Sequence, residues 1–293
     1  MTGQNRLGSA FAGGLVRALK LLPARARVAL AAGLGRLAFR LGIRRRITLE
    51  NLRAAFPELP AEARCSIAKG AYANMALAVM EGLCSDALTD AGLERAVVTE
   101  NWAPMQAALD AGKGVLVATA HFGSWELVGE VIARRGVKVH AVVRPLRGAL
   151  NDRMVESRRR SGMRFIPTRG TILASAKALR RGEMVAMLID QVLPAERGVF
   201  VPFFGRPACT TPALSMAAIR TGAPVFVVMA AREGDHLRMF VEGPFPVADS
   251  GDRRRDLVDH TAKVTAVLEQ YIRRYPDQWL WLHRRWKVQP LRS

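Results

Sequence analysis

Cysteine is scarce in this chain of 293 residues, and the three that occur, Cys65, Cys84 and Cys209, form no CxxC pair. The sequence therefore predicts neither a disulfide framework nor a zinc site, and it fits a reducing compartment. The chain also lacks the GxSxG sequence that marks a nucleophilic serine on a strand-to-helix turn. Glycine and proline are present in ordinary amounts and half of the residues are hydrophobic, which excludes a disordered chain.

Acidic residues are few relative to basic ones. There are 25 Asp and Glu against 44 Lys and Arg, which gives a formal net charge of +19. Such an excess predicts attraction to an anionic partner: nucleic acid, a membrane surface, an acidic protein or a phosphorylated substrate. No RNA- or DNA-binding motif is present, so nucleic acid is not the expected partner. The plain alternative is that part of this charge is solvated surface.

The N-terminal region has no uncharged run of the roughly 20 residues that a membrane-spanning helix needs. Residues 7–43 are apolar overall, but Pro23 and six basic residues interrupt them, and they do not fit a cleaved signal peptide either. A pair of apolar and cationic helices remains, with the composition of an interfacial membrane anchor. An ordinary helical hairpin packed on the domain is the alternative. We therefore expect a helical, basic, membrane-facing segment over residues 1–45 and a single α/β domain over 46–293.

Strand-like runs begin only after a long helical region. Residues 1–110 have mostly helical composition, and no strong strand pattern precedes residue 114. Apolar, β-branched runs then alternate with helix-like stretches. The runs are GVLVATA (114–120), VKVHAVV (137–143), MRFIP (163–167), EMVAMLID (183–190), APVFVVMA (223–230) and LRMFVEG (237–243).

Four of the junctions before these runs share one local pattern, in which arginine in a last helical turn is followed by Gly136, Gly162, Gly182 or Gly222. Cationic side chains favour the negative end of a helix, and glycine tolerates a left-handed cap. Repeated helix-to-strand crossovers of this kind indicate an α/β fold with a mostly parallel central sheet flanked by helices.

The stretch HFGSWE follows the first of these strands and sets His121 five residues before Glu126. On one continuous helix these residues would lie about 140° apart and face away from each other. They can meet only if His121 precedes the helix and Glu126 lies in its first turn. A turn through Phe122 and Gly123, with Ser124 as the N-cap, would achieve this.

Three polar residues fall at the carboxyl ends of predicted strands, where open α/β sheets bind ligands. They are His121, Arg144 and Asp190. A neutral histidine is a suitable general base near pH 7, and a carboxylate partner fixes its tautomer. A histidine and a glutamate at this spacing also occur by chance, and a lone histidine is more often structural, so the spacing by itself leaves both readings open.

The sequence around HFGSWE resembles the HX4D/E motif of the glycerolipid acyltransferase superfamily, and its context resembles the late acyltransferases of lipid A biosynthesis. The resemblance runs through most of the chain. The segments that carry it are RRRITLENLRAAFPE (44–58), HFGSWE (121–126), VVRP (142–145), MLIDQ (187–191), GVFVPFFGRPACTTP (198–212), RTGAPV (220–225) and YPDQWLWLHRRWK (275–287).

This resemblance implies a role for particular residues. His121 matches the catalytic base of the family and Glu126 its acidic partner, and Arg144 and Asp190 lie in blocks associated with the active site. We expect Arg144 or backbone amides to stabilise the oxyanion, and Asp190 to act as an orienting group and not as a second base. The block that contains Gly205, Thr210 and Thr211 lies near the acyl and acceptor sites in the family, and Arg206 in the same loop is a candidate for the acceptor phosphate. Family members often carry one N-terminal membrane helix, which arginines interrupt here.

The implied activity is acyl transfer at a membrane surface, from an acyl thioester to a hydroxyl of a lipid A precursor, with a His/Glu general base and no covalent intermediate. The expected donor is acyl-acyl carrier protein, and no metal or other cofactor is needed. The expected partners are acyl carrier protein, an anionic glycolipid and the membrane, at the cytoplasmic face of the bacterial inner membrane in peripheral or monotopic association. One alternative is an acyl-CoA-dependent enzyme for another glycolipid, such as a phosphatidylinositol mannoside. Another is a non-catalytic polyanion- or membrane-binding protein.

The segment YPDQWLWLHRRWK combines Trp279, Trp281 and Trp286 with arginine and lysine. Tryptophan with cations suits a membrane interface or stacking on single-stranded nucleic acid. We expect instead that the tryptophans pack this segment against the core. The histidines outside HFGSWE have no ligand spacing and are expected to be structural or exposed; they are His140, His236, His260 and His283.

Overall fold

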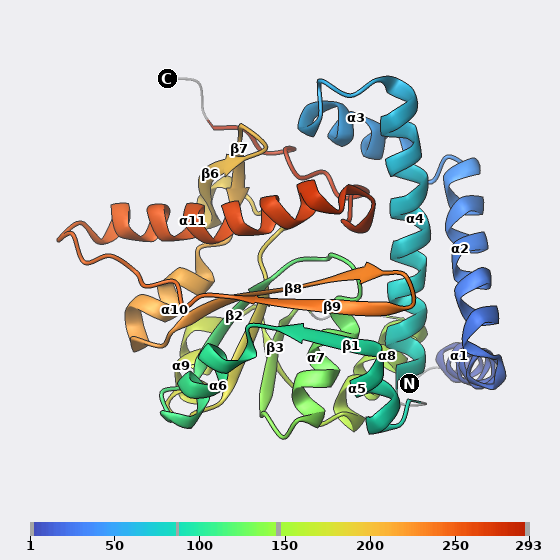
Figure 1. Ribbon diagram of the computed structural model, residues 1–293, viewed down its shortest axis with the longest axis horizontal. Coiled ribbons are helices and arrows are strands. Elements are labelled where there is room, and N and C mark those ends of the chain that lie inside the picture. The colour runs from blue at the N-terminus through green and yellow to red at the C-terminus, as the bar shows by residue number, and fades with distance from the viewer. Residues whose placement is uncertain (1–2, 86–87, 145–147, 291–293) are drawn as a thin grey trace.

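The protein is described by a computed structural model that covers residues 3–85, 88–144 and 148–290 (Figure 1). Its core is a seven-stranded sheet in the order β1-β9-β8-β2-β5-β3-β4, in which β8, β2, β5, β3 and β4 run parallel and β9 and β1 run the opposite way. The strands are β1 (Val97–Glu100), β2 (Val115–Thr119), β3 (Val139–Val143), β4 (Arg164–Pro167), β5 (Met184–Leu188), β8 (Val225–Glu233) and β9 (His236–Glu242). The sequence prediction of a mostly parallel α/β sheet is confirmed.

The central strands are buried on both faces, as the continuous apolar runs predict. In β2, Leu116 and Ala118 contribute to one core cluster, and Val115 and Val117 contribute to another on the opposite side. This alternation follows from the two-residue period of a strand. Helices cover both faces of the sheet, so neither face of its central strands is left to solvent.

Two groups of helices cover the two faces of the sheet (Figure 1). On one face lie α9 (Thr171–Leu179), α10 (Ala213–Thr221) and α11 (Arg253–Arg274), and on the other lie α5 (Asp90–Ala96), α6 (Trp102–Asp110) and α7 (Trp125–Arg134). Two short 3₁₀ segments, η2 (Ala195–Arg197) and η3 (Pro276–Gln278), complete the connections.

The remaining helices form a layer beside the sheet. They are α1 (Gly3–Leu21), α2 (Ala24–Arg40), α3 (Arg45–Ala55), α4 (Ala61–Cys84) and α8 (Ala149–Arg160). Figure 1 shows α4 running along one edge of the molecule with α2 outside it. The pair packs through small residues of α2, because a Cβ on Gly35 would lie 2.3 Å from the main-chain oxygen of Tyr72. Among the described residues, no helix combines the length and the hydropathy needed to cross a membrane.

The four glycines at the predicted helix ends have the expected left-handed backbone. Their φ angles are +87° at Gly136, +88° at Gly162, +72° at Gly182 and +67° at Gly222. All six predicted strands are present, although the last is antiparallel to its neighbour β8. Such a reversal comes from the tight turn at Gly234, which leaves no room for a crossover helix.

Three strands escaped the sequence analysis. β1 precedes residue 114, where no strand pattern was recognised, and it is short, with only Val97 fully buried. The other two, β6 (Val199–Phe203) and β7 (Arg206–Thr210), form a separate antiparallel hairpin. Its turn consists of Phe204 and Gly205, both with positive φ, and this geometry is typical of a two-residue hairpin loop.

The tryptophans near residue 280 pack inside the protein. Trp279, Trp281 and Trp286 are 1%, 0% and 8% exposed. Phe203 of the β6–β7 hairpin contacts Trp279 and Trp286 at ring-centroid distances of 5.5 and 5.9 Å. The packing interpretation of this segment is therefore confirmed, and these rings are not available to a membrane or to nucleic acid.

Candidate active site

The strand register brings His121 and Asp190 together. β2 and β5 are adjacent and parallel, with Thr119 opposite Leu188. His121 and Asp190 each lie two residues beyond these positions, so they leave the sheet side by side at its carboxyl edge. Two of the three polar residues predicted at this edge therefore meet directly.

Asp190 holds His121 by two hydrogen bonds. Its Oδ1 lies 2.9 Å from the ring Nδ1, and its Oδ2 accepts a hydrogen bond of 2.9 Å from the main-chain N–H of His121. The carboxylate is only 1% exposed, whereas the imidazole is 24% exposed. A third donor, the indole N–H of Trp279, reaches Oδ2 at 2.9 Å. Asp190 thus fixes both the position and the tautomer of the ring.

The electrostatics of the pair favour its charged form. Burial by itself would raise the pKa of Asp190, but the charge of His121 and the three hydrogen bonds lower this pKa to about 2. Burial likewise opposes a charged imidazole, but the charge and hydrogen bond of Asp190 outweigh it and raise the pKa of His121. A base held in this way has increased affinity for a proton.

The turn that presents His121 is tied to the segment after α11. The main-chain N–H of Leu280 donates to the oxygen of His121 at 3.1 Å, and the N–H of Gly123 donates to the oxygen of Gln278 at 2.8 Å. Gly123 has a φ of +52°, and a Cβ there would lie 1.8 Å from the oxygen of Ala230 in β8. Only glycine allows the chain to turn this close to the sheet.

Glu126 lies in the first turn of α7, as predicted, but its hydrogen bonds go elsewhere than expected. Arg158 of α8 binds both carboxylate oxygens, with Nε 2.7 Å from Oε2, and the indole N–H of Trp125 donates to Oε1 at 2.8 Å. Among the described residues Glu126 forms no hydrogen bond with His121, although its charge contributes to the raised pKa of the ring. We expected Glu126 to hold the imidazole of His121. Asp190 holds it instead, because the β2–β5 register brings the carboxylate of Asp190 to Nδ1 of the ring.

Two neighbours fix the start of α7 against α4. Ser124 is the N-cap residue, as predicted, but its side chain does not cap the helix: its hydroxyl donates to the carboxylate of Glu81. Gly82 of α4 allows Glu126 to pack closely against that helix, since a Cβ on residue 82 would lie 2.9 Å from the Cγ of Glu126. The charged pair of Glu126 and Arg158 is thus enclosed between α4, α7 and α8.

The other ring nitrogen of His121, Nε2, is the one left for chemistry. The side-chain amide nitrogen of Gln191 lies 3.4 Å from it. The ring of Trp125 lies edge-on to the imidazole, with a centroid separation of 5.4 Å. With its Nδ1 proton directed to Asp190, the neutral ring exposes a basic nitrogen beside an amide and an aromatic wall.

His283 is a second histidine beside the site, although the sequence offered no ligand pattern for it. Its Nε2 accepts a hydrogen bond of 3.0 Å from the main-chain N–H of Val192. Burial lowers the pKa of His283 to about 4, which keeps the ring neutral at pH 7. It therefore supports the segment after β5 and does not compete with His121 for a proton.

The other predicted site residues are more dispersed. Arg144 is exposed beyond the end of β3, and Pro145 lies outside the described residues. Gly205 lies at the turn of the β6–β7 hairpin with a φ of +68°. Arg206 follows it, and its guanidinium lies 6.0 Å from the ring centre of Trp286. Thr211 accepts a hydrogen bond from the N–H of Ala213 at the start of α10.

Thr210 accepts a hydrogen bond from a buried arginine, Arg285. Arg285 is 0% exposed and donates to the hydroxyl oxygen of Thr210 at 2.5 Å and to the main-chain oxygen of Cys209 at 2.8 Å. Burial lowers the pKa of Arg285 to about 10, against the opposing attraction of the Asp190 charge. This arginine joins β7 to the segment that holds the His121 turn, and it adds positive potential around Asp190.

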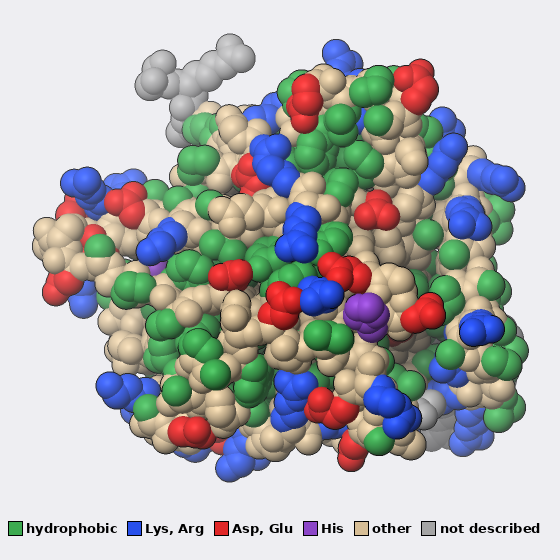
Figure 2. Space-filling view, in the orientation of Figure 1, with side chains coloured by type: hydrophobic (Ala, Val, Ile, Leu, Met, Phe, Trp, Pro, Cys, Tyr) green, Lys and Arg blue, Asp and Glu red, His purple; other side chains and the backbone are tan. Residues whose placement is uncertain are grey.

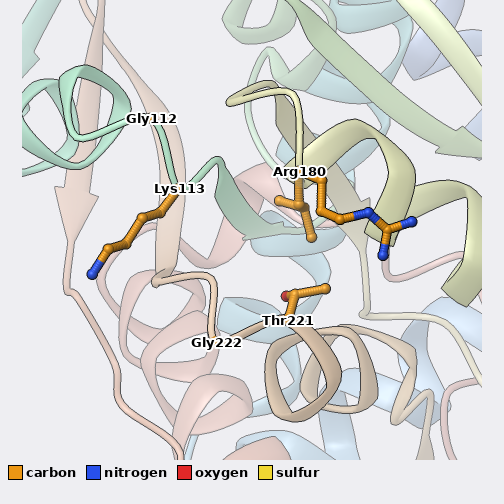
Figure 3. Close-up of a pocket in the computed structure, with 6 residues that line it drawn as sticks. Gly112, Lys113, Arg180, Thr221 and Gly222 are labelled. Atoms are coloured by element: carbon orange, nitrogen blue, oxygen red, sulfur yellow. The ribbon is translucent and has the colours of Figure 1, made fainter.

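A separate hollow of about 410 Å³ lies at the opposite edge of the sheet (Figure 3). It is lined by Gly112 and Lys113 just before β2, by Leu179 and Arg180 at the end of α9, and by Thr221 and Gly222 at the end of α10. His121 follows the other end of β2, so this hollow is not part of the site around the histidine. Among the described residues no cluster of three or more His, Cys, Asp or Glu side chains could hold a metal ion.

The sequence model of the bacterial lipid A biosynthesis acyltransferase family matches residues 6–288. The chain belongs to this family. It is therefore an enzyme, an O-acyltransferase, and membership supports acyl transfer in lipid A biosynthesis. The acyltransferase is 26% identical over 251 residues to the lipid A biosynthesis palmitoleoyltransferase of Escherichia coli K12, covering 85% of this chain and 80% of the relative.

Two further relatives extend this comparison. The lipid A biosynthesis lauroyltransferase of the same organism is 27% identical over 267 residues, which cover 89% of this chain and 85% of the relative. The phosphatidylinositol mannoside acyltransferase of Mycolicibacterium smegmatis is 29% identical over 187 residues, which cover 61% of this chain and 59% of the relative. The similarity to the lipid A enzymes thus spans more of both chains.

Sequence reasoning missed three side chains of the acyltransferase site, and it assigned no role to a fourth, Gln191, which it placed with Asp190 at the end of a strand. Arg158 stands in an arginine run that reads as a solvated helix end, and Trp279 and His283 stand in a segment that reads as packing. Gln191 adjoins Asp190 but carries no charge that would single it out. Its place in the sequence does indicate the site, because Gln191 follows β5, a strand that ends at the same edge of the sheet as β2.

Proposed function

We propose that this acyltransferase moves a fatty acyl chain to a hydroxyl of a lipid A precursor at a membrane surface. The donor in this proposal is an acyl thioester, namely acyl-acyl carrier protein. The single observation that carries the mechanism is the pairing of His121 with the buried carboxylate of Asp190, which leaves Nε2 accessible. An imidazole braced at Nδ1 by a carboxylate is the arrangement of a general base.

In the proposed reaction, Nε2 of His121 accepts the proton of the acceptor hydroxyl while the hydroxyl oxygen attacks the thioester carbonyl. The tetrahedral intermediate then collapses, the carbon–sulfur bond breaks, and the sulfur leaves as a thiol after taking the proton from His121. The products are an ester and a free thiol, and no acyl-enzyme forms. Asp190 stabilises the imidazolium between the two proton transfers.

Glu126 contributes to this proposal through charge and position. Its negative charge favours a protonated His121, whereas the positive charge of Arg158 opposes it. Because the two are joined in one ion pair, their effects on the pKa of the ring oppose each other, with that of Glu126 the larger. We infer that the pair places α7 and α8 around the site, and that Asp190 orients the base.

The choice of donor rests on charge. The net charge of +19 would steer an acidic carrier protein toward the enzyme and accelerate their encounter. Figure 2 shows Lys and Arg side chains over much of the face displayed, with acidic side chains among them toward the middle. Arg144 and Arg206 are exposed candidates for a phosphate of the donor or of the acceptor.

The membrane location rests on α2. Four leucines on one side of this helix are exposed: Leu30 by 39%, Leu34 by 50%, Leu37 by 50% and, at its C-cap, Leu41 by 69%. They lie within about 60° of one another on a helix that turns about 100° per residue. We call this set the leucine stripe, and the side of α2 that packs on α4 points away from it.

Cations adjoin the leucine stripe. Arg36 and Arg40 are exposed on α2, and Arg44 and Arg45 follow at the N-cap and the first residue of α3. Exposed leucines beside arginines are the arrangement of a helix that lies in the interface of an anionic membrane. We therefore propose that residues 1–45 anchor the enzyme peripherally, at the cytoplasmic face of the bacterial inner membrane, and that residues 46–293 form the acyltransferase domain.

The alternative of an acyl-CoA donor and a phosphatidylinositol mannoside acceptor draws on the mycobacterial relative. We favour the lipid A precursor because the lipid A relatives match over more of the chain. A non-catalytic polyanion-binding protein is disfavoured, because membership in the family makes the chain an enzyme.

The deciding experiment is mass spectrometry of the lipid product made by the purified enzyme. Acyl-acyl carrier protein and acyl-CoA with the same chain are each supplied with a lipid A precursor or with a phosphatidylinositol mannoside. We expect an acylated lipid A precursor from the carrier-protein donor, and a loss of about 10²–10⁴-fold in turnover in His121→Ala. Product from the other acceptor alone would contradict the substrate assignment, and a fully active His121→Ala protein would contradict the base.

Flotation with liposomes tests the membrane location. The triple substitution of Leu34, Leu37 and Leu41 by serine should abolish binding to vesicles that contain anionic lipid. Leu173→Ser is the matched control, because Leu173 is 59% exposed but lies on α9. Equal binding by both variants would show that the leucine stripe is not the membrane contact.

A further inference from the structure

We propose that the side-chain amide of Gln191 is the donor that stabilises the oxyanion of the tetrahedral intermediate. This assignment rests on the proposed acyl transfer and names a further catalytic residue for it. Three observations support it: the position of the amide, the hydrogen bonds already made by neighbouring main-chain N–H groups, and the charges around the ring.

The position of the amide follows from β5. Asp190 and Gln191 are consecutive residues at its carboxyl end, and they meet opposite sides of the same imidazole. Asp190 Oδ1 lies 2.9 Å from Nδ1, and Gln191 Nε2 lies 3.4 Å from Nε2 of the ring. One short segment therefore supplies both the group that orients the base and a polar group at its reactive nitrogen.

This place suits an oxyanion donor. The attacking oxygen must lie in hydrogen-bond reach of Nε2, and the oxyanion is bonded to the same carbon that this oxygen attacks. A donor about 3 Å from the oxyanion must therefore lie close to Nε2 of His121. Gln191 meets this condition, and its exposed side chain is free to turn from the ring toward a bound thioester.

Four of the main-chain donors in the neighbouring turns are already engaged. In many acyl-transfer enzymes backbone N–H groups bind the oxyanion. Here four such groups next to the ring already donate within the protein. The pairs are His121 to Asp190 Oδ2 at 2.9 Å, Phe122 to Ala120 O at 2.8 Å, Gly123 to Gln278 O at 2.8 Å, and Val192 to His283 Nε2 at 3.0 Å.

The charged donor nearest the helix start is engaged as well. Arg158 is held by Glu126 through Nε at 2.7 Å and through a second nitrogen. Using it as the oxyanion donor would leave the carboxylate of Glu126, which is 5% exposed, without its cation. A neutral amide avoids this cost, and it does not lower the proton affinity of His121 as a nearby guanidinium would.

Gln191 then has two states. In the free enzyme its amide occupies the position beside Nε2 that the acceptor hydroxyl must take. When the hydroxyl binds there, the amide is displaced and donates to the thioester oxygen, whose negative charge grows as the new bond forms. The interaction is strongest in the transition state, so its loss should lower kcat more than it changes KM.

The test compares Gln191→Glu and Gln191→Ala with the wild-type enzyme and with His121→Ala. Both Gln191 variants lack the N–H donor, and we expect kcat to fall by about 10²–10³-fold with the KM for the donor nearly unchanged. The added carboxylate in Gln191→Glu should also move the acid limb of the pH–rate profile to higher pH, whereas Gln191→Ala should lose kcat without that shift. Gln106→Glu is the matched control, since it makes the same chemical change on α6, away from the site.

Each outcome decides the assignment. Normal kcat in both Gln191 variants, with His121→Ala inactive, would overturn the role of Gln191 and leave the proposed function in place. An equal loss in Gln106→Glu would overturn it too, because the effect would then be unspecific. No transfer by the wild-type enzyme with any of the donor and acceptor pairs would overturn the proposed function and the role of Gln191 with it.

Discussion

Replacing Asp190 by asparagine separates the role of its charge from that of its shape. Oδ2 accepts two hydrogen bonds, from His121 N and Trp279 Nε1, whereas Oδ1 faces only the ring Nδ1. An amide will keep its oxygen where two donors converge and turn its NH2 group toward Nδ1. The ring must then accept at Nδ1 and carry its proton on Nε2, where it can no longer act as a base.

The structure also gives the size of the electrostatic effect. The pKa of Asp190 is about 2 instead of 3.8, and at about 1.4 kcal/mol per unit this corresponds to roughly 2–3 kcal/mol in favour of the carboxylate. By reciprocity the same coupling raises the pKa of His121, which must be deprotonated to act. Wild-type activity should therefore rise with pH through a value above 6.5.

For Asp190→Asn we expect kcat to fall by about 10³–10⁴-fold, as when a catalytic histidine is held in the wrong tautomer. The residual activity should have its acid limb at lower pH, because the carboxylate that favoured the imidazolium is gone. Steady-state acyl transfer across the pH range measures both effects, and ¹⁵N NMR of the imidazole reports the tautomer. A folded variant with near-normal turnover, or with the proton still on Nδ1, would refute the reasoning.

Three further outcomes follow from the same geometry. Glu126→Gln, unlike Asp190→Asn, should leave the imidazole tautomer seen by ¹⁵N NMR unchanged. It should lower the free energy of unfolding by about 3 kcal/mol, because the largely buried guanidinium of Arg158 loses its carboxylate partner. An altered tautomer would show that Glu126 orients the ring. Gly123→Ala should give misfolded or inactive protein, because its Cβ would lie 1.8 Å from a carbonyl oxygen of β8, whereas Gly136→Ala, with open space around it, should cost only about 1 kcal/mol in urea unfolding; equal effects would contradict this. Glu183, whose pKa is about 2 instead of 4.5, stabilises the fold above pH 4.5 and loses this effect as pH falls toward 2, so Glu183→Gln should be less stable by about 2–3 kcal/mol at pH 7 and nearly equal to wild type near pH 2. A stability difference that persists at pH 2 would argue against ionisation as its cause.

The fold was accessible from the sequence because its signals are local. An arginine followed by glycine ends a helix through the chain's own carbonyl groups, and a β-branched run forms a strand wherever both of its faces are covered. Gly162 and Gly222 show this directly, with φ values of +88° and +67°. The β6–β7 hairpin escaped because its turn, Phe204 and Gly205, includes a bulky residue at positive φ that no turn rule favours.

The site was only partly accessible, because which side chains meet depends on strand order. Sequence reasoning placed His121, Arg144 and Asp190 at one edge of a sheet and Glu126 in the first turn of the following helix, and all four lie in those places. It paired His121 with the residue nearest along the chain, whereas the adjacency of β2 and β5 pairs it with Asp190, 69 positions away. The contact between Glu126 and Arg158 depends in the same way on where α8 packs, which no local pattern encodes.

The segment at 278–283 has a consequence for how the enzyme acquires activity. Gln278 and Leu280 hold the main chain of the His121 turn, and Trp279 completes the hydrogen bonds of Asp190. None of these residues belongs to the seven-stranded sheet, yet the reacting groups are fixed only when this segment has docked against the His121 turn. Contacts between such distant parts of a chain are slow to form during folding. A molecule in which this segment has not yet docked would therefore not react with the acyl donor, and activity would require the contacts between residues 278–280 and the His121 turn.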